Sequence, residues 1–428
     1  MHKQLLPNIH GKKWQKKLQL SIKLSMKKSS QKKPAIALVY DKLTTTYGGA
    51  EWVLLALHEA FPNAPLYTTL HLQKKTPWTK VFTVFTSFLQ RSPYKNHRFL
   101  VWLFPLAFES LDFSEYDVII SITSGEAKGI LTKPNQVHIS YILTPPRYLY
   151  SHKETYLNSL PLLKLPFISY FVQKLFAYLQ WWDQAAAARP DRVIAISKKI
   201  QSRINQTYNR TADLIYPPVT DIPPTVQPFT PPAPYLLSLS RLVAYKRIDL
   251  SIQAAIATHS NLIISGKGEE EKRLIDSAGT HAFIRKKEPL IQWLQNHLSN
   301  VSRECRILFV GHVTNQERLK LLAGAQALLM PGLEDFGITA LEAASLGTPS
   351  ILHKESGVSE VLAHKKHALH ISRESIAVLQ AAIEDLPHHT FAFTTLQTQA
   401  KTCSTRVFTS KFQKYMYDSI ILSKSEKK

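Results

Sequence analysis

Cysteine, acidic residues and long apolar runs are all scarce in this sequence, and each scarcity excludes a class of protein. The two cysteines, Cys305 and Cys403, cannot form a disulfide framework, so reduced cytoplasmic thiols are expected. The 17 histidines are scattered, and no Cys or His cluster has metal-ligand spacing. The longest apolar stretches, over 99–108 and 160–182, are too short or too interrupted for a membrane-spanning helix of ~20 apolar residues. A soluble protein is expected, with surface attachment left open.

Acidic residues are so few that the chain carries a large positive charge. The 31 Asp and Glu residues face 53 Lys and Arg residues, for a net charge of +22, which attracts polyphosphates, nucleic acid or anionic membranes. Residues 1–33 contain ten lysines and no acid. They predict either a disordered, solvated tail or a segment that associates with anionic lipid. The aromatic-rich basic motifs of RNA-binding sheets are absent, so no specific nucleic-acid partner is expected.

Beyond this tail, short apolar runs alternate with longer amphipathic segments. Helices are expected at 50–60 and 247–259. Strands alternating with helices predict α/β architecture, with parallel sheets covered on both sides. The expected strands are 35–40, 118–122, 137–142, 192–196, 235–240, 261–266, 306–311 and 327–331.

A proline-rich segment separates two such α/β halves. Eight prolines among the nineteen residues 216–234 exclude a helix or an interior strand, so a semi-rigid linker is expected, with 223–234 as its centre. The sequence therefore predicts a first Rossmann-like domain over 34–222 and a second over 235–402. The cleft between two such domains is the usual place for a ligand.

Three places are suited to hold an anion. Gly48 and Gly49 open the first helix, where backbone N–H groups can approach a phosphate. Arg241 and Lys246 follow the first strand of the second half and suit a diphosphate. A third place, after the next strand, has the two glycines Gly266 and Gly268. Plain turns and solvated surface cations are the alternative interpretation of all three.

Two glutamates eight positions apart, in "PGLEDFGITALEAASLGTPS", form the fourth candidate. Glu334 is expected in a loop after a strand, and Glu342 on the following helix, which stops at Gly347. Carboxylates in these places can accept hydrogen bonds from hydroxyl groups of one ligand. The helix N-terminus near Phe336 and Gly337 offers N–H groups to a phosphate. The alternative is a turn acid and an exposed helix glutamate.

Taken together and in order, these segments resemble the retaining, nucleotide-sugar-dependent glycosyltransferases of family 4, which have the GT-B fold of two Rossmann-like domains. The resemblance rests on "RLVAYKRIDL", on the E-x7-E motif, on "SGVSE", and on "DKLTTTYGGAEWVL", "AKGI" and "YILTPPRYLY" in the first half. It covers about 35–420 and is similar to mannosyltransferase-like members. The segment 408–421 resembles the family's closing helix, which implies that 403–428 returns to the first domain.

The resemblance implies a role for each candidate residue. Arg241 and Lys246 would bind the donor diphosphate, and Glu334 the hydroxyls of the donor sugar; these three are the expected catalytic residues. Glu342 would hold the ribose. Further donor contacts would come from Gly49, Phe336, Gly337 and Ile338. The glycine pairs described above add Gly48, Gly266 and Gly268 to the expected donor-binding residues. The acceptor-side candidates are Asp41, Thr144 and Arg147.

The activity implied is transfer of a hexose, with mannose favoured, from a nucleotide-diphosphate sugar to a glycan or lipid-linked acceptor, with retention of configuration. GDP-mannose is favoured over a UDP-sugar. The metal-binding D-x-D motif is absent, so neither a metal nor another cofactor is expected. The expected location is the cytoplasm, with peripheral attachment to the inner face of the membrane left open. A degenerate donor-binding protein without turnover and a sugar-nucleotide epimerase on the same fold are the alternatives.

The sequence departs from the mannosyltransferase-like pattern at two positions. Leu143 stands where these members usually have His, and Tyr150 where they usually have Trp. Leucine cannot donate or accept a proton, so either the enzyme works without the imidazole or its acceptor or activity has changed. His138 and His152 are close in sequence, but nothing in the sequence shows that they substitute.

Overall fold

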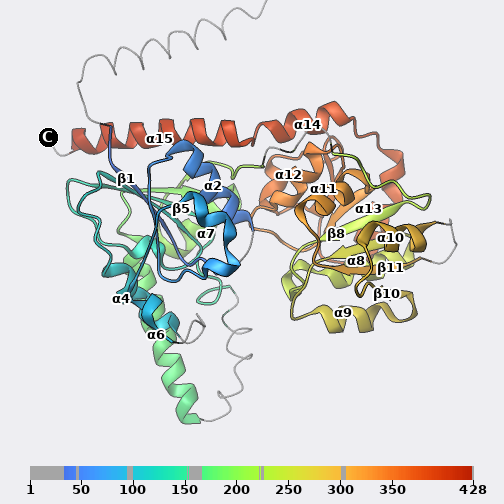
Figure 1. Ribbon diagram of the computed structural model, residues 1–428, viewed down its shortest axis with the longest axis horizontal. Helices are drawn as coiled ribbons and strands as arrows, with labels where there is room; N and C mark the ends of the chain where they lie inside the picture. Colours follow the sequence, from blue (N-terminus) through green and yellow to red (C-terminus); the bar gives the residue numbers. More distant parts are fainter. Residues whose placement is uncertain are drawn as a thin grey trace, which may run out of the picture. The chain divides into compact units, whose positions relative to one another are not determined.

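The structure is a computed structural model that describes residues 33–44, 48–93, 100–151, 153, 166–220, 222, 226–299 and 305–426 (Figure 1). The chain divides into two units, Met1–Ala35 and Ile36–Lys428. The basic tail predicted for 1–33 lies outside the described residues except for Lys33.

The first half of the second unit is built on a parallel sheet. Its strand order is β3-β2-β1-β4-β5-β6-β7, and every neighbouring pair is parallel. The strands are β1 (Ile36–Tyr40), β2 (Leu66–Thr68), β3 (Val84–Thr86), β4 (Val118–Thr123), β5 (Val137–Ile142), β6 (Arg192–Ala195) and β7 (Asp213–Leu214). All four strands predicted for this half are confirmed to within one residue. β4 and β5 are buried along their whole length, as expected of a parallel sheet covered on both faces.

Four α-helices accompany this sheet in the described part of the chain. They are α2 (Gly49–Ala60), α4 (Phe104–Glu109), α6 (Pro166–Ala187) and α7 (Lys198–Tyr208). The helix predicted at 50–60 is confirmed as α2. Short 3-10 turns include η4 (Val101–Leu103) and η5 (Ala127–Gly129).

The second half repeats the arrangement. Its parallel sheet has the order β10-β11-β9-β8-β12-β13-β14. The strands are β8 (Tyr235–Leu239), β9 (Asn261–Ser265), β10 (Ala282–Ile284), β11 (Ile307–Gly311), β12 (Ala327–Met330), β13 (Ser350–His353) and β14 (Ala368–Ile371). The four strands predicted for this half are confirmed.

Helices cover this second sheet as well, and the chain ends in a long one. They are α8 (Ile248–Ala257), α9 (Glu271–Ala278), α10 (Leu290–Leu298), α11 (Asn315–Gly324), α12 (Ile338–Ser345), α13 (Ile376–Asp385), α14 (Phe393–Lys401) and α15 (Thr405–Glu426). The 3-10 turns η7 (Ala244–Lys246) and η9 (Gly357–Glu360) matter for the site. The predicted helices at 247–259 and after Gly337 are confirmed as α8 and α12.

The closing helix returns to the first half. α15 packs against α2 and β5 (Figure 1, red beside blue). Where the chain leaves the first half, the backbone N–H of Val219 donates to the carbonyl of Cys403 at 2.8 Å, and Val219 forms a parallel bridge with Ser404. The outgoing and returning segments are therefore hydrogen-bonded to each other. The domain boundaries themselves stay predictions.

Among the described residues, no helix is both long and apolar enough to cross a membrane.

Candidate functional site

The strand order of each sheet reverses at one place, and the candidate residues follow the strands there. In the second sheet, β9 and β12 lie on opposite sides of β8, so the loops after β8 and β12 adjoin at the carboxyl edge. Such a switch point is where open α/β sheets bind ligands. The two loops touch, since a Cβ at Gly332 would lie 2.2 Å from the Tyr245 carbonyl oxygen. Glycine at this position lets η7 and the β12–α12 loop pack closely.

Lys246 and Glu334, predicted on separate loops, form an ion pair at this switch point. Both side chains are mostly buried, with 18% and 12% of their surfaces exposed. The backbone N–H of Glu334 donates to Ser356 Oγ at 3.1 Å, which holds the loop in place. The pair thus puts a cation, a group that can bind phosphate oxygens, beside a carboxylate, a group that can accept from hydroxyl groups, in a largely buried setting.

Three cations surround the Tyr245 ring beside this pair. The Arg147 guanidinium lies 4.6 Å and the Lys246 ammonium 5.3 Å from the ring centroid. Arg241 donates to the Tyr245 hydroxyl at 3.3 Å. Burial alone would raise the pKa of Tyr245, but the charges of Lys246 and Arg147 outweigh it, so the pKa is lowered. The region therefore favours negative charge, which suits a diphosphate.

Gly337 is the N-cap of α12, so the N-terminus of this helix lies where it was predicted. Gly337 has φ +102°, a left-handed conformation that glycine adopts without strain, and a Cβ there would lie 3.1 Å from Met330 Cε. Phe336 is buried, and its carbonyl accepts from Val358 N at 2.8 Å. Ile338 is the first residue of α12, and a Cβ on Gly49 would lie 3.9 Å from its Cγ2 atom. Gly48 is the N-cap of α2, so the N-termini of α2 and α12 adjoin.

Glu342 has a partner that the sequence did not suggest. Its carboxylate is buried on α12 and forms an ion pair with Arg318 of α11. The Arg318 side chain also donates to Asn315 Oδ1 at 2.8 Å. The charge of Glu342 is therefore balanced within the chain, and the structure places it on the helix as predicted.

Gly266 and Gly268 are explained by packing. A Cβ at Gly266 would lie 1.8 Å from the Ser240 carbonyl oxygen, and one at Gly268 would lie 2.0 Å from the Leu242 carbonyl oxygen. Close backbone approach alone therefore requires glycine at both positions. Their contact with a nucleotide stays a prediction.

Sequence reasoning missed a cluster that lies one residue from Glu334. Asp335 accepts hydrogen bonds from Arg147 Nε at 3.2 Å and Nη2 at 2.5 Å, and from Arg203 Nη1 at 2.8 Å. Burial would raise the pKa of Asp335, but the two guanidinium groups outweigh it and lower the pKa. We call Asp335, Arg147 and Arg203 the arginine clamp. It joins a loop of the second half to the β5–α6 loop and α7 of the first.

Further bonds from α7 support the clamp. Ser197 Oγ donates to the Asp335 carbonyl at 2.9 Å, and Lys199 Nζ donates to the Glu334 carbonyl at 3.1 Å. Burial lowers the pKa of Lys199 to about 8. The Glu360 carboxylate of η9 accepts from the backbone N–H groups of Lys198 and Lys199 at 2.9 and 3.2 Å. This acid from the second half therefore caps α7.

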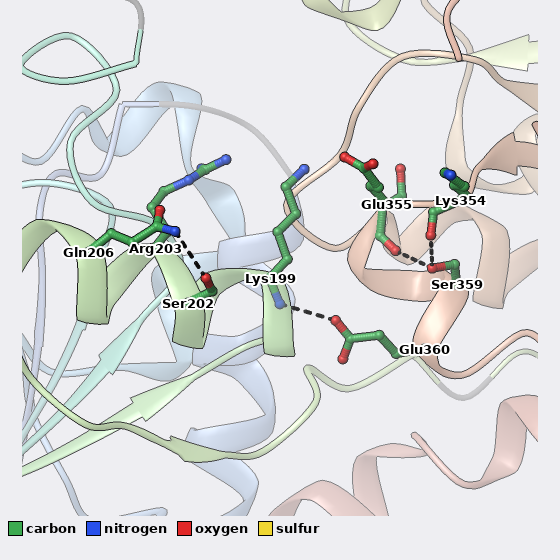
Figure 2. A pocket seen from close by; sticks show the side chains of 9 residues that line it. Lys199, Ser202, Arg203, Gln206, Lys354, Glu355, Ser359 and Glu360 are labelled. Atoms are coloured by element: carbon green, nitrogen blue, oxygen red, sulfur yellow. Dashed lines mark hydrogen bonds between the residues drawn. The ribbon is translucent and has the colours of Figure 1, made fainter. Parts of the chain in front are cut away.

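A polar pocket of about 390 Å³ adjoins the clamp. Figure 2 shows α7 on one side and the segment around η9 on the other, with side chains of both signs between them. The charged residues of the lining are Lys199, Arg203, Lys354, Glu355 and Glu360.

The acceptor-side candidates are all bonded within the chain. The Asp41 carboxylate accepts from Thr123 Oγ1 at 2.7 Å, Ser124 N at 2.8 Å and Ala127 N at 2.9 Å, so it ties together the ends of β1 and β4. These strands flank the switch point of the first sheet. Thr144 accepts from Arg203 at 3.0 Å, and Arg147 belongs to the clamp. An acceptor role for these residues stays a prediction.

Leu143 and Tyr150, the two departures from the mannosyltransferase-like pattern, both contact other parts of the chain. Leu143 packs against the core, and the Tyr150 hydroxyl donates to Asp183 Oδ2 at 2.8 Å. His138 is near the start of β5, at the edge opposite the site. It is fully buried with Nε2 2.9 Å from Ser121 Oγ, and burial lowers its pKa to about 3. His138 therefore does not replace the missing imidazole, and His152 lies outside the described residues.

Part of the chain is similar to proteins of a known family. Residues 225–390 match the family described as glycosyl transferases group 1. Glycogen synthase of Mycobacterium tuberculosis is 31% identical over 166 residues, which are 37% of this chain and 35% of that protein. The chain thus spans about a third of the length of this curated relative.

Solved structures resemble nearly the whole chain. Sucrose-phosphate synthase of Thermosynechococcus elongatus superposes with a TM-score of 0.62 at 15% identity, covering 91% of this chain and all of that one (100%). The Anabaena protein HepE in complex with UDP and glucose gives a TM-score of 0.57 at 16% identity, covering 90% and 100%. At such identities the likeness shows the fold alone.

The two seven-stranded parallel sheets and these neighbours define the GT-B fold, which confirms the predicted fold class. The match of residues 225–390 to glycosyl transferases group 1 lies in the second half of this fold.

Proposed function

We propose that the protein is a glycosyltransferase that transfers a hexose from a nucleotide-diphosphate sugar to a glycan or lipid-linked acceptor. The observation that carries the proposal is the Lys246–Glu334 ion pair at the β8/β12 switch point, beside the N-terminus of α12. A cation beside a carboxylate suits a ligand that carries both a diphosphate and sugar hydroxyls. The group 1 domain over 225–390 supports the same activity.

The chemistry follows from where charge develops. The bond between the sugar C1 and the diphosphate oxygen breaks, and its electron pair stays on the diphosphate. Lys246, Arg241 and the α12 N-terminus stabilise the charge that builds there. Glu334 holds the sugar hydroxyls. The acceptor oxygen bonds to C1 on the same face and passes its proton to the leaving phosphate, so configuration is retained without a protein nucleophile or a metal.

Finer points of the proposal rest on the sequence. Mannose from GDP-mannose is favoured by the first-half motifs, with a UDP-sugar as the alternative donor. The first domain, 34–222 with 403–428, would hold the acceptor, and the second, 235–402, the donor. The proposed location is the cytoplasm, and the proposed role is polysaccharide or lipopolysaccharide biosynthesis.

The test is calorimetric titration with GDP-mannose, UDP-glucose, UDP-N-acetylglucosamine and the free diphosphates. We expect saturable binding of one nucleotide sugar. Lys246→Ala should weaken it about tenfold or more, because a charge-assisted hydrogen bond contributes ~1.5–3 kcal/mol. Lys401→Ala, on the exposed end of α14, is the matched control and should bind as the wild type.

Binding alone does not separate an enzyme from a degenerate donor-binding protein. Time-resolved release of the free diphosphate with a glycan acceptor does so, and conversion of the nucleotide sugar to an epimer would identify the epimerase. No binding by the folded wild type would refute the proposal.

A further inference from the structure

The outer face of α6 carries a row of exposed aromatic rings. Positions i, i+4, i+7, i+11 and i+14 share one side of a helix, and here they are four aromatic residues with Lys174 in the middle. Phe167 is 74% exposed and Trp181 67% exposed, at the two ends of the row. We call the exposed rings the aromatic stripe: Phe167, Tyr170, Phe171, Tyr178 and Trp181.

The stripe cannot turn inwards, because the opposite face of α6 is anchored. Phe176 and Leu179 pack with Leu149 in a buried cluster. Trp182 Nε1 donates to Glu109 Oε1 at 2.7 Å. Asp183 is 1% exposed, accepts from Tyr150 and Tyr208, and forms an ion pair with Lys128. Figure 1 shows α6 in green, with its first turns pointing away from the strands.

The rings of the stripe form two groups of contacts, one on each side of Lys174. Phe167 and Phe171 meet edge-on with centroids 4.7 Å apart, and the Tyr178 and Trp181 centroids are 6.3 Å apart. The stripe runs over about 21 Å, at ~1.5 Å rise per residue. A row of exposed aromatic side chains of this kind marks an interaction site.

We propose that the aromatic stripe inserts into the interfacial region of a lipid bilayer that contains anionic lipid. Tyr and Trp are the side chains that settle at the boundary between headgroups and acyl chains, because each combines an apolar ring with a polar group. The helix would lie in the plane of the interface, as an amphipathic helix does, rather than span the bilayer.

The charge of α6 complements such a surface. Lys174 sits within the stripe, with its ammonium 5.5 Å from the Tyr170 ring centroid, and Lys153 lies beside the helix, donating to Gln180 at 3.3 Å. The one acid of α6 is Asp183, whose charge is buried and neutralised by Lys128. The exposed face of α6 therefore offers the Lys174 cation, and no carboxylate, to lipid phosphates.

A second copy of the chain fits this face less well. Lys174 is the midpoint between Phe167 and Trp181. In a two-fold antiparallel packing of two stripes, the two Lys174 ammonium groups would meet at the centre and repel each other. Lipid phosphates carry the opposite charge and would attract the Lys174 ammonium group.

A neighbouring segment carries two further exposed apolar side chains. Val101 of η4 packs against the cluster that holds Phe176 and Leu179. The next residue, Trp102, and Leu106 of α4 are both exposed and lie four positions apart. This inference goes beyond the proposed function, because adsorption to a membrane needs neither donor nor turnover.

The test compares full-length variants for binding to vesicles of phosphatidylcholine and phosphatidylglycerol in ~1 M NaCl. The Debye length there is about 3 Å, which suppresses attraction through the basic tail. We expect Phe171→Ala/Trp181→Ala to lower the partition coefficient at least about tenfold, equal to ~1.4 kcal/mol. The matched control is Tyr417→Ala/Ile421→Ala, two exposed residues of α15, which should bind as the wild type.

A second measurement locates the contact. Vesicles with brominated acyl chains should quench tryptophan fluorescence of the wild type, and Trp181→Phe should lose much of this quenching while it still binds. Stripe variants that partition like the wild type would overturn the inference. So would a concentration-dependent dimer that only the stripe variants lose. Nucleotide-sugar titration reads out the proposed function separately, so the two can fail independently.

Discussion

The arginine clamp predicts that Asp335, which makes no hydroxyl or phosphate contact in the proposed reaction, controls turnover through Glu334. Asp335→Ala removes the acceptor of three N–H groups from Arg147 and Arg203. Glu334 precedes it in the chain and faces Lys246. Without the clamp, the β12–α12 loop loses the ion pairs that join it to α7 and to the β5–α6 loop.

The size of the effect follows from exposure. A charge-assisted hydrogen bond contributes ~1.5–3 kcal/mol. The Asp335 side chain is 11% exposed, but those of Arg147 and Arg203 are 27% and 26% exposed, so water replaces part of what is lost. We therefore expect a loss of about 2–4 kcal/mol in unfolding free energy. A displacement of the loop by ~1 Å would lower kcat about 100-fold, with a smaller change in KM for the donor.

Glu109→Ala is the matched control. Glu109 also accepts from an arginine, with side chains 27% and 25% exposed, and additionally from Trp182. The Glu109→Ala variant should lose a comparable amount of unfolding free energy and keep the wild-type kcat. Urea unfolding and initial rates of donor turnover measure both. A wild-type kcat in Asp335→Ala, or an equal fall of kcat in both variants, would refute a positioning role.

The clamp also has a pH signature. The pKa of Asp335 is lowered in the folded state, so the clamp contributes stability above the unfolded pKa of ~3.9 and loses it as pH falls through the folded value. The stability difference between wild type and Asp335→Ala should therefore shrink in acid. A difference that stays constant from neutral pH to below pH ~3 would contradict the assigned charge.

Three further predictions concern buried carboxylates. Burial and the neighbouring Asp41 raise the pKa of Glu126 from 4.5 to about 7. Between acid pH and pH 7, the unfolding free energy of the wild type should therefore fall by about 3 kcal/mol more than that of Glu126→Gln. Urea midpoints that shift equally in both proteins would contradict this. Asp183→Ala leaves the buried Lys128 without its ion-pair partner and should lower the unfolding free energy by ~3–5 kcal/mol. Asp418→Ala, in an exposed pair, should lower it by at most ~1 kcal/mol. Equal losses in urea unfolding would refute the difference. Glu342→Ala should weaken nucleoside diphosphate binding about tenfold but leave pyrophosphate binding unchanged in calorimetry, if it holds the ribose; parallel losses would exclude that role.

Much of the fold could be predicted because the strands that carry it are apolar and uninterrupted. β4 and β5 are buried from end to end, so their sequences read as strands without knowledge of their neighbours. Short strands were missed. β2 and β3 have three residues each and β7 two, too few for a pattern, and their positions depend on pairing with the central strands.

The candidate site was predictable where its residues follow strands, and less so where tertiary contacts decide. Lys246 and Glu334 each follow a central strand, so both were found. Asp335 is 188 positions from Arg147 and 132 from Arg203, and no local pattern links residues so far apart. Gly266 and Gly268 looked like phosphate-loop glycines, whereas the packing of the loop after β8 already explains them.

The return of α15 to the first half has a consequence for synthesis on the ribosome. Phe408, Phe412 and Met416 of α15 are buried, and the rings of Phe408 and Phe412 lie 5.9 and 6.0 Å from that of Tyr141 on β5. Burying three such side chains contributes about 5–9 kcal/mol, comparable to the whole stability of a domain. The half that is translated first therefore completes its core last. Until α15 has left the ribosome, the nascent chain exposes an apolar surface that needs protection from aggregation.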